Sequence, residues 1–336
     1  MARIGFDGLM ISPRGKGHAR SEKHAVEALA ALGEHELVVF VQEPAAIDGV
    51  EVVEVEPRLT IDWELRGMPA AAKRHRLDVF VTLSERLPLA GSLPIVVWLF
   101  ESPVHRIRAN RRSGAPLWHR SSDVLTTLLW KRSLFRAAHV AFGSEATRCD
   151  VLSELALGST SVVYPGVPPG FSPGGSGHEP YVLHLGSNDP RDNTAVAVEA
   201  CRRACVPLRV VGGWTGEGAD VLGRVSDTEL TGLYRRAGCF LDPTLYEGFG
   251  YGVLEAMASG TPVVASNSTS IPEVVGDAGL LCDPRSAEEL ARALRRVLDE
   301  PGLADELRAR GYAQASTFTW VRTAEGLSAA IAAALS

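Results

Sequence analysis

The sequence is poor in cysteine, with five among 336 residues. These cysteines follow no metal or disulfide spacing. Cys201 and Cys205 lie four positions apart in a stretch with helical periodicity, which is more typical of buried free thiols than of a bridge. None of the nine histidines belongs to an HExxH pattern, and no Asp-x-Asp occurs. We therefore expect no dedicated metal site and a reducing, cytoplasmic location.

Excess positive charge and long hydrophobic runs are also missing. The formal net charge is -6 at pH 7, whereas nucleic acids are bound by basic faces. No apolar run approaches the roughly 20 residues that cross a bilayer. The opening "MARIGFDGLM" runs directly into a strand pattern and does not resemble a signal peptide. We expect no nucleic-acid partner and no membrane-spanning segment.

What is present is the composition of an ordinary globular protein, with 46% apolar and 22% charged residues. Because 336 residues exceed the size at which a single core usually stops growing, two domains are expected. Short β-branched runs alternate with helical stretches such as 19–32, 123–138 and 193–205. The expected strands are 3–7, 36–41, 78–83, 94–100, 139–144, 160–165, 181–186, 208–213, 238–243, 262–266 and 278–284. Strands this apolar predict parallel sheets with helices on both faces.

A stretch rich in glycine and proline, "PGVPPGFSPGGSGHEP", interrupts the alternation at residues 165–180. We interpret it as the connection between two doubly wound α/β units. The first unit is expected over residues 1–168, and the linker over 169–180. The second unit follows over 181–316, and a final amphipathic helix lies in 317–336.

Two acids, Glu247 and Glu255, flank the glycine-rich segment "EGFGYG". A strand should end before this segment and a helix should begin after it. Glycines there let the main chain approach a ligand, and free N–H groups at a helix start attract anions or hydroxyl groups. The two carboxylates can then hold separate parts of one hydroxyl-rich ligand, as a carboxylate holds a ribose. The pair alone leaves another interpretation open, in which Glu255 only favours the helix N-terminus and Glu247 is solvated.

The residues around the pair closely resemble a known signature. Residues 238–284, which include "YEGFGYGVLEAMASGTPVV" and "PEVVGDAG", resemble the signature of retaining GT-B glycosyltransferases of the GT4 type. This is the glycosyl transferases group 1, related to bacterial mannosyl- and rhamnosyltransferases. Looser similarity covers "SPRGKGHARSEKHAVEALAALG", "LHLGSNDPRDN" and "GRVSDTELTGLYRRA". The resemblance thus extends over nearly the whole chain and is weakest in residues 45–135.

The resemblance implies a GT-B fold, in which two Rossmann-like domains face each other across a cleft. The N-terminal domain (1–168) would bind the acceptor, and the second domain (181–316) the nucleotide sugar. The final helix would cross back to the N-terminal domain. The resemblance further implies a retaining, metal-independent hexosyltransferase. Such an enzyme moves a sugar from a nucleotide-diphosphate sugar, a UDP- or GDP-sugar, to a hydroxyl of a glycan, a lipid or a small natural product, with no cofactor besides the donor.

Roles for individual residues also follow from the resemblance. Glu247 would lie beside the donor sugar and act in catalysis, and Glu255 would bind the ribose hydroxyls. The remaining donor contacts would come from backbone or small side chains. Those near the sugar and diphosphate are Gly15, Gly17, Ser187, Gly248, Phe249 and Gly250, and those near the ribose and base are Arg224, Val225 and Ser226.

One departure from the family pattern concerns the diphosphate. Asp192 stands where many relatives carry a phosphate-binding lysine, and an anion beside a diphosphate opposes binding. Our hypothesis is that Arg191 and Lys16 share the task of neutralising the diphosphate.

A second departure follows the fourth expected strand. Relatives often have His-Asp there, whereas this chain has Phe100 and Glu101. Glu101 or His105 would contact the acceptor, unless both belong to a solvated loop. Residues 105–120 hold five Arg and two His, which fits either a solvated surface or a dock for an anionic acceptor or a peripheral membrane contact.

Two other classes of protein stay open. A catalytically idle GT-B module would bind a nucleotide sugar or a partner protein without transferring the sugar, and Asp192 and the missing His-Asp favour it. An NAD-dependent dehydrogenase would need Gly-x-Gly-x-x-Gly after the first strand, where this sequence reads "GLMISPRGKGHA". Intact Glu247 and Glu255 count against the idle module, and the missing glycine pattern counts against the dehydrogenase.

Overall fold

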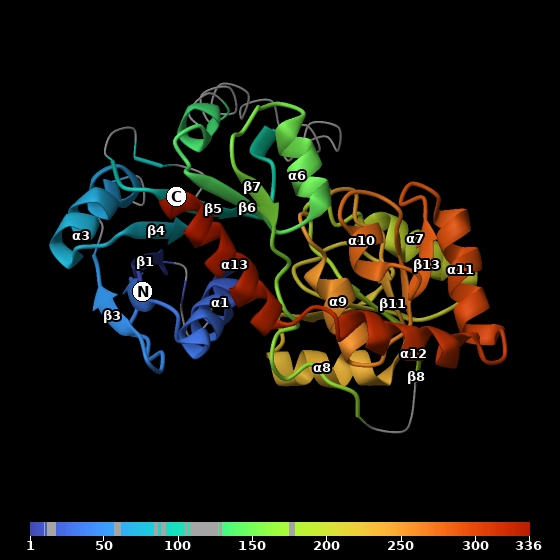
Figure 1. Ribbon diagram of the computed structural model, residues 1–336. Coiled ribbons are helices and arrows are strands. Elements are labelled where there is room, and N and C mark those ends of the chain that lie inside the picture. Colours follow the sequence, from blue (N-terminus) through green and yellow to red (C-terminus); the bar gives the residue numbers. More distant parts are fainter. Residues whose placement is uncertain are drawn as a thin grey trace. The chain divides into compact units, whose positions relative to one another are not determined.

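The computed structural model describes residues 1–9, 11, 18–56, 62–83, 87–88, 92–104, 107, 127, 130–174 and 179–336. The chain divides into two compact units of α/β structure (Figure 1). The first unit contains the described residues from Met1 to Val104, those from Thr127 to Gly166, and Phe318–Ser336. The second unit contains Ile107 and the described residues of Val167–Thr317.

The first unit is built on a parallel sheet with the strand order β3-β2-β1-β4-β5-β6-β7. Its strands are β1 (Arg3–Asp7), β2 (Glu36–Val41), β3 (Glu51–Glu54), β4 (Val79–Thr82), β5 (Ile95–Leu99), β6 (His139–Phe142) and β7 (Thr160–Val162). The direction of winding reverses between β1 and β4. In open α/β sheets, such a reversal opens a crevice beyond the carboxyl ends of the strands.

Helices flank this sheet. They include α1 (His18–Leu32), the π-helix η1 (Trp63–Gly67) that continues into α3 (Met68–His75), α6 (Glu145–Leu152) and α13 (Trp320–Leu335). Although α13 follows the second unit in sequence, it belongs to the first and packs beside α1 (Figure 1). The Thr323 hydroxyl on α13 donates to the Tyr164 carbonyl at 2.8 Å. The Ser328 hydroxyl donates to Glu34 at 2.6 Å.

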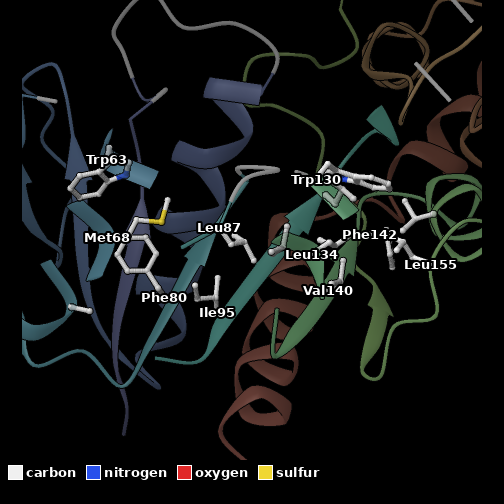
Figure 2. Packing of buried hydrophobic residues seen from close by; sticks show 14 of the residues in the cluster. Trp63, Met68, Phe80, Leu87, Ile95, Trp130, Leu134, Val140, Phe142 and Leu155 are labelled. Carbon is white, nitrogen blue, oxygen red and sulfur yellow. The ribbon is translucent and has the colours of Figure 1, made fainter. Parts of the chain in front are cut away.

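The core of the first unit is rich in large side chains, as Figure 2 shows for residues such as Met68, Phe80 and Trp130. Phe40 stacks on Phe80 with ring centroids 5.7 Å apart, and Trp63 approaches Phe40 to 5.4 Å. Burial of each large apolar side chain contributes about 1.5–3 kcal/mol relative to exposure. These contacts fix η1 against the sheet and so carry Trp63 to the carboxyl end of β1.

The second unit repeats the plan with the strand order β10-β9-β8-β11-β12-β13, again all parallel. The strands are β8 (Glu179–Leu185), β9 (Leu208–Val211), β10 (Asp220–Gly223), β11 (Ala237–Asp242), β12 (Val263–Ser266) and β13 (Gly279–Cys282). The helices are α7 (Thr194–Ala204), α8 (Asp227–Arg236), α9 (Tyr251–Ala258), α10 (Ile271–Val275), α11 (Ala287–Asp299) and α12 (Leu303–Ala315). Here the reversal lies between β8 and β11.

The predicted fold class, α/β with two Rossmann-like doubly wound sheets, is confirmed. All eleven expected strands are present, and the described residues contain two further strands, β3 and β10, that were not expected. Both lie at sheet edges with no fully buried residue, so their sequences lack the apolar run of a central strand. Strand β8 begins at Glu179, within the stretch interpreted as a linker.

The prediction of buried thiols is right for Cys201 and wrong for Cys205. Cys201 is buried on α7, whereas Cys205 is exposed. The helix ends at Ala204, and Cys205 takes a left-handed conformation with φ 58° that closes the last turn. It therefore leaves the apolar face that the helical spacing predicts.

A buried carboxyl group, Asp7, ends β1 at the point where the winding of the first sheet reverses. One oxygen accepts from Trp63 Nε1 at 3.2 Å, and the other from Thr82 Oγ1 at 2.8 Å. Burial raises the pKa of Asp7 from 3.8 to about 6, although hydrogen bonds from Thr82, Leu9 and Trp63 oppose the rise. Because the folded-state pKa exceeds the unfolded one, ionisation of Asp7 favours unfolding. Stability is thus lost as the pH rises from 3.8 to about 6.

We predict that Asp7→Asn stabilises the protein more at pH 7.5 than at pH 4.5. A shift of about two pKa units corresponds to a gain of up to about 3 kcal/mol, because asparagine keeps the shape and carries no charge to bury. Urea denaturation at both pH values measures the difference. The matched control is Asp48→Asn, at an exposed position whose substitution should give the same effect at both. An effect of Asp7→Asn that does not depend on pH would contradict the assignment.

Candidate functional site

The candidate site lies where the second sheet changes its direction of winding, at the carboxyl ends of β8, β11 and β12. Three loops follow these strands, over residues 186–193, 243–250 and 267–270. Sequence reasoning placed Ser187 and Arg191 on the first loop and Glu247 on the second. The topology brings all three loops to one edge of the sheet, where doubly wound proteins bind their ligands.

Hydrogen bonds tie these loops together. The Arg191 carbonyl accepts from the Leu245 N–H at 2.8 Å and from the Thr244 hydroxyl at 3.0 Å. The Asn193 side-chain amide donates to the carbonyl groups of Pro243 at 2.9 Å and Pro284 at 2.7 Å. Asn193 itself has φ 55°, a left-handed conformation that asparagine adopts more readily than most residues. A few hydrogen bonds therefore fix the loops after β8, β11 and β13 relative to one another.

The Arg191 guanidinium group forms an ion pair with Asp189, with Nη2 2.8 Å from Oδ2. Nε contacts both carboxylate oxygens, at 3.2 and 3.1 Å, and the Arg191 N–H donates to Oδ1 at 2.9 Å. Burial tends to raise the pKa of Asp189, but the hydrogen bonds and charge of Arg191 outweigh this and hold it below its usual value. The cation predicted for the diphosphate is thus held on its own loop by a neighbouring anion.

Asp192, the residue that departs from the family pattern, accepts a hydrogen bond from the Ser187 hydroxyl. Burial raises the pKa of Asp192, and the nearby charge of Asp189 adds to the rise. Asp242, at the end of β11, is affected more strongly. Burial raises its pKa to about 7, the Thr244 N–H opposes this, and Asp192 adds to it. The Ser187 hydroxyl, predicted to contact the donor, therefore donates its hydrogen bond to the Asp192 carboxyl group.

The turn that carries Glu247 is fixed through its main chain. The Glu247 N–H donates to Thr269 Oγ1 at 3.2 Å, and its carbonyl accepts from Ser270 Oγ at 2.9 Å. Gly250 begins α9 with φ 109°, and a Cβ there would lie 2.8 Å from the Ile271 side chain. Only glycine fits this position without strain. Phe249 is buried, so its main chain is the part suited to contact a ligand.

Glu255 lies on α9 and is only 2% exposed. The Tyr234 hydroxyl lies 3.4 Å from Glu255 Oε2 and 3.2 Å from the Gly252 carbonyl. A carboxylate this buried requires polar partners. The burial weighs against the interpretation in which Glu255 merely favours the helix N-terminus.

The predicted base-binding segment, Arg224 to Ser226, joins β10 to α8. The Ser226 hydroxyl accepts from the Glu229 N–H at 3.2 Å, while the Glu229 carboxylate accepts from the Ser226 N–H at 2.8 Å. This capping box commits Ser226 to the start of α8. Arg224 is exposed and Val225 half-buried.

The other predicted positions are divided. Gly15, Lys16, Gly17 and His105 lie outside the described residues. Glu101 is half-buried and directly follows Phe100, one residue beyond the end of β5.

In the part of the chain that the structure describes, no group of three or more His, Cys, Asp or Glu side chains is placed to hold a metal ion. None of the helices described there has the length and apolarity needed to cross a membrane.

A cavity of about 560 Å³ lies elsewhere, in the first unit. It is lined by Lys73, Asp78 and Arg136, among others, and by residues that begin β5. Its position at the amino ends of β4 and β5 is opposite to the edge at which ligands bind in doubly wound sheets. The cavity is therefore separate from the candidate site.

Several residues of the site could not be found by sequence reasoning. Thr269 and Ser270 sit in a polar run after β12, where nothing in the sequence distinguishes a structural hydroxyl from a solvated one. Asn193 follows Asp192 in a loop where sequence reasoning assigned roles only to Ser187, Arg191 and Asp192. Tyr234 has the spacing of a buried helix residue and gives no sign of its contact with Glu255.

Sequence comparisons place the second unit among glycosyltransferases. Residues 176–314 match the family model "Glycosyl transferases group 1". O-antigen chain mannosyltransferase B of Escherichia coli is 38% identical over 162 residues, which are 42% of this chain and 42% of that protein. Glycogen synthase of Mycobacterium tuberculosis is 44% identical over 103 residues, 30% of this chain and 25% of that protein. The matches thus span less than half the length of these relatives.

Solved structures match over nearly the full chain. Sucrose-phosphate synthase from Thermosynechococcus elongatus has a TM-score of 0.78 at 19% identity, covering 98% of both chains. Anabaena HepE in complex with UDP-glucose has a TM-score of 0.72 at 18% identity, covering 99% of this chain and 100% of that chain. At this identity the likeness shows the fold, which is GT-B. Residues 176–314 form a glycosyl transferases group 1 domain, and the resemblance inferred from residues 238–284 is confirmed.

We predict that Asn193→Ala destabilises the protein by about 2–4 kcal/mol, because two carbonyl groups lose a donor and alanine strains at a positive φ. Asn193→Gly should cost about 1 kcal/mol less, since glycine adopts this φ freely. Urea denaturation followed by circular dichroism measures both. The control pair Arg76→Ala and Arg76→Gly, at an exposed helix end with φ 53°, isolates the conformational part. Equal losses for both Asn193 variants would contradict this role of the backbone conformation.

Proposed function

We propose that the protein is a retaining glycosyltransferase that moves a sugar from a nucleotide-diphosphate sugar to an acceptor hydroxyl. The observation that carries the proposal is the arrangement of Glu247 and Glu255. One lies on a hydrogen-bonded turn and the other is buried on the helix that follows, at the reversal point of a glycosyl transferases group 1 domain. A glycine-rich turn that leads into a helix start suits a ligand that is both anionic and rich in hydroxyls.

The donor is proposed to lie along the edge of the second sheet. Glu255 would accept from the ribose hydroxyls, and Glu247 with the main chain from Gly248 to Gly250 would hold the sugar. The burial of Phe249 and the positive φ of Gly250 support a main-chain role for this segment. The ribose and base would extend toward Arg224, Val225 and Ser226.

The reaction requires that charge be stabilised in two places. The bond between the anomeric carbon and the diphosphate oxygen breaks, and the acceptor oxygen forms a new bond to that carbon on the same face. The acceptor proton passes to the departing diphosphate. The sugar carries positive charge in an oxocarbenium-like state, which the Glu247 carboxylate stabilises, while the diphosphate gains negative charge. Arg191 and Lys16 are proposed to neutralise the diphosphate without a metal ion.

The names of two relatives guide the choice of donor and acceptor. The name of the mannosyltransferase relative favours a mannosyl donor, and the HepE structure with UDP-glucose favours a UDP-sugar. We propose a hydroxyl on a glycan or a lipid-linked glycan as the acceptor. A peripheral membrane contact through residues 105–120 stays a prediction.

We predict that the protein binds GDP-mannose or UDP-glucose and releases the nucleoside diphosphate when a saccharide acceptor is present. Glu255→Gln should weaken binding of the free nucleoside diphosphate about tenfold, because a charge-assisted hydrogen bond to ribose is lost. Glu247→Gln should lower kcat about 100-fold or more at similar nucleotide affinity, because its charge acts on the sugar. Calorimetry and a coupled assay for diphosphate release measure these effects. Glu325→Gln, at an exposed position on α13, is the matched control.

Two results would contradict the proposal. Binding of the donor with neither transfer nor slow hydrolysis, over a range of saccharide acceptors, would favour the idle GT-B module. No binding of any nucleotide sugar would remove the donor site itself. Retention would be checked from the anomeric configuration of the product by NMR, and inversion would overturn the same-face mechanism.

We predict that Arg191→Ala and Lys16→Ala each weaken donor binding by about three- to tenfold, because each cation is partly screened and the two share one diphosphate. Asp192→Asn should strengthen it by a similar factor, since an anion beside the diphosphate is removed. Calorimetric titration with the nucleoside diphosphate measures all three. Asp299→Asn, an exposed change of the same charge, is the control. Unchanged affinity in both cation variants would refute the sharing hypothesis.

A further inference from the structure

The loop between β12 and α10 contains a strained residue. Thr269 has φ 55°, in the left-handed region. A β-branched side chain rarely adopts this conformation, and residues held in it concentrate where a precise geometry is required. Glycine would relieve the strain, but glycine has no side-chain oxygen. The position thus combines an unfavourable backbone conformation with a hydroxyl group.

The loop is held firmly on both sides. The Asn267 N–H donates to the Cys282 carbonyl at 2.9 Å, which anchors the loop to the end of β13. The Ser266 and Ser268 hydroxyls lie 2.6 Å apart, and Ser266 Oγ also accepts from the Ser268 N–H. On the other side, the Gln314 amide donates to the Val274 carbonyl of α10 at 3.1 Å. Such anchoring can maintain the conformation of Thr269 despite its cost.

What this loop holds is the main chain of Glu247. Thr269 Oγ1 accepts from the Glu247 N–H at 3.2 Å, and Ser270 Oγ donates to the Glu247 carbonyl at 2.9 Å. Two adjacent hydroxyls therefore fix the two polar main-chain groups of one residue. Ser270 is fully buried, and Ile271 packs over Gly250 at the other end of the same turn. Together these contacts leave the turn little freedom to rotate.

We infer that Thr269 and Ser270 are positioning residues that fix the main chain of Glu247 and thereby aim its carboxylate at the donor sugar. The inference rests on the proposed function for the identity of the ligand. The two hydrogen bonds to the Glu247 main chain, however, are a property of the unliganded protein. Neither hydroxyl is assigned a contact with the reacting atoms. Their effect is on the sugar end of the donor and not on its nucleotide end, which Glu255 would bind.

The first experiment tests the hydrogen bond between Thr269 and the Glu247 main chain without any ligand. Hydrogen exchange of the Glu247 amide, followed by NMR, should be at least about tenfold faster in Thr269→Val than in the wild type, because the acceptor is lost. Thr269→Ser should restore slow exchange. Thr323→Val, which removes a buried hydroxyl from α13 in the first unit, is the matched control and should leave this amide unchanged. An unchanged rate in Thr269→Val would overturn the inference whatever the protein binds.

The second experiment separates positioning from stability. Thr269→Val and Thr269→Gly both lack the hydroxyl, but only glycine relieves the strain, so Thr269→Gly should have the higher Tm. Both should lose about tenfold in kcat and in the ratio of affinities for nucleotide sugar and free nucleoside diphosphate, measured with UDP-glucose and UDP or with GDP-mannose and GDP. Ser270→Ala should change the same two quantities in the same direction.

The outcomes separate the positioning role from the proposed function. If the wild type binds no nucleotide sugar, the proposed function fails. The exchange experiment still shows whether Thr269 holds the Glu247 amide. If the wild type binds and transfers, while Thr269→Gly keeps full kcat and the full affinity ratio, the positioning role fails and the proposed function stands. A loss in Thr269→Val that only follows its lower Tm, and is absent in Thr269→Gly, would show a purely structural role.

Discussion

The site depends above all on the hydrogen bonds that join separate strand-end loops at one edge of the second sheet. A parallel sheet brings the carboxyl ends of its strands together, but it does not fix the loops beyond them. Here the Asn193 amide bridges the loops after β11 and β13, and the Arg191 carbonyl holds the loop after β11 a second time. Thr269 and Ser270 fix the far part of that loop. Glu247 is thus carried by a loop whose main chain is hydrogen-bonded to its neighbours on both sides.

Charge at this edge is balanced in an unusual way. The two acids proposed to bind the donor share the edge with three others, Asp189, Asp192 and Asp242. Arg191 compensates Asp189 directly, and burial raises the pKa of both Asp192 and Asp242. Asp192 accepts from the Ser187 hydroxyl, so its carboxyl group also has a polar partner on its own loop.

The sequence allowed prediction of features that depend on a continuous run of residues, such as the buried strands and the glycine-rich turn. The buried strands could be predicted because a short run that is apolar on both faces is typical of a strand covered by two layers of helices, whereas the edge strands β3 and β10 lack such a run. The turn around Glu247 was predictable because its glycine-rich sequence includes Gly250, whose backbone conformation (φ 109°) requires glycine. Residues that act through one hydroxyl or amide, such as Asn193 and Thr269, gave no signal, since their roles depend on contacts between loops distant in sequence. Cys205 shows the converse, because its spacing indicated burial but the helix ended one residue earlier.

The return of α13 to the first unit has a consequence for the order in which the protein can be completed. The Thr319 hydroxyl caps this helix, and Leu327 and Ile331 lie buried in a unit whose other elements precede residue 167. On the ribosome, the early sheet must therefore wait for residues 318–336 before that apolar surface is covered, while the later sheet already has all its helices. Nascent chains would pass through a stage in which the half made second is finished first.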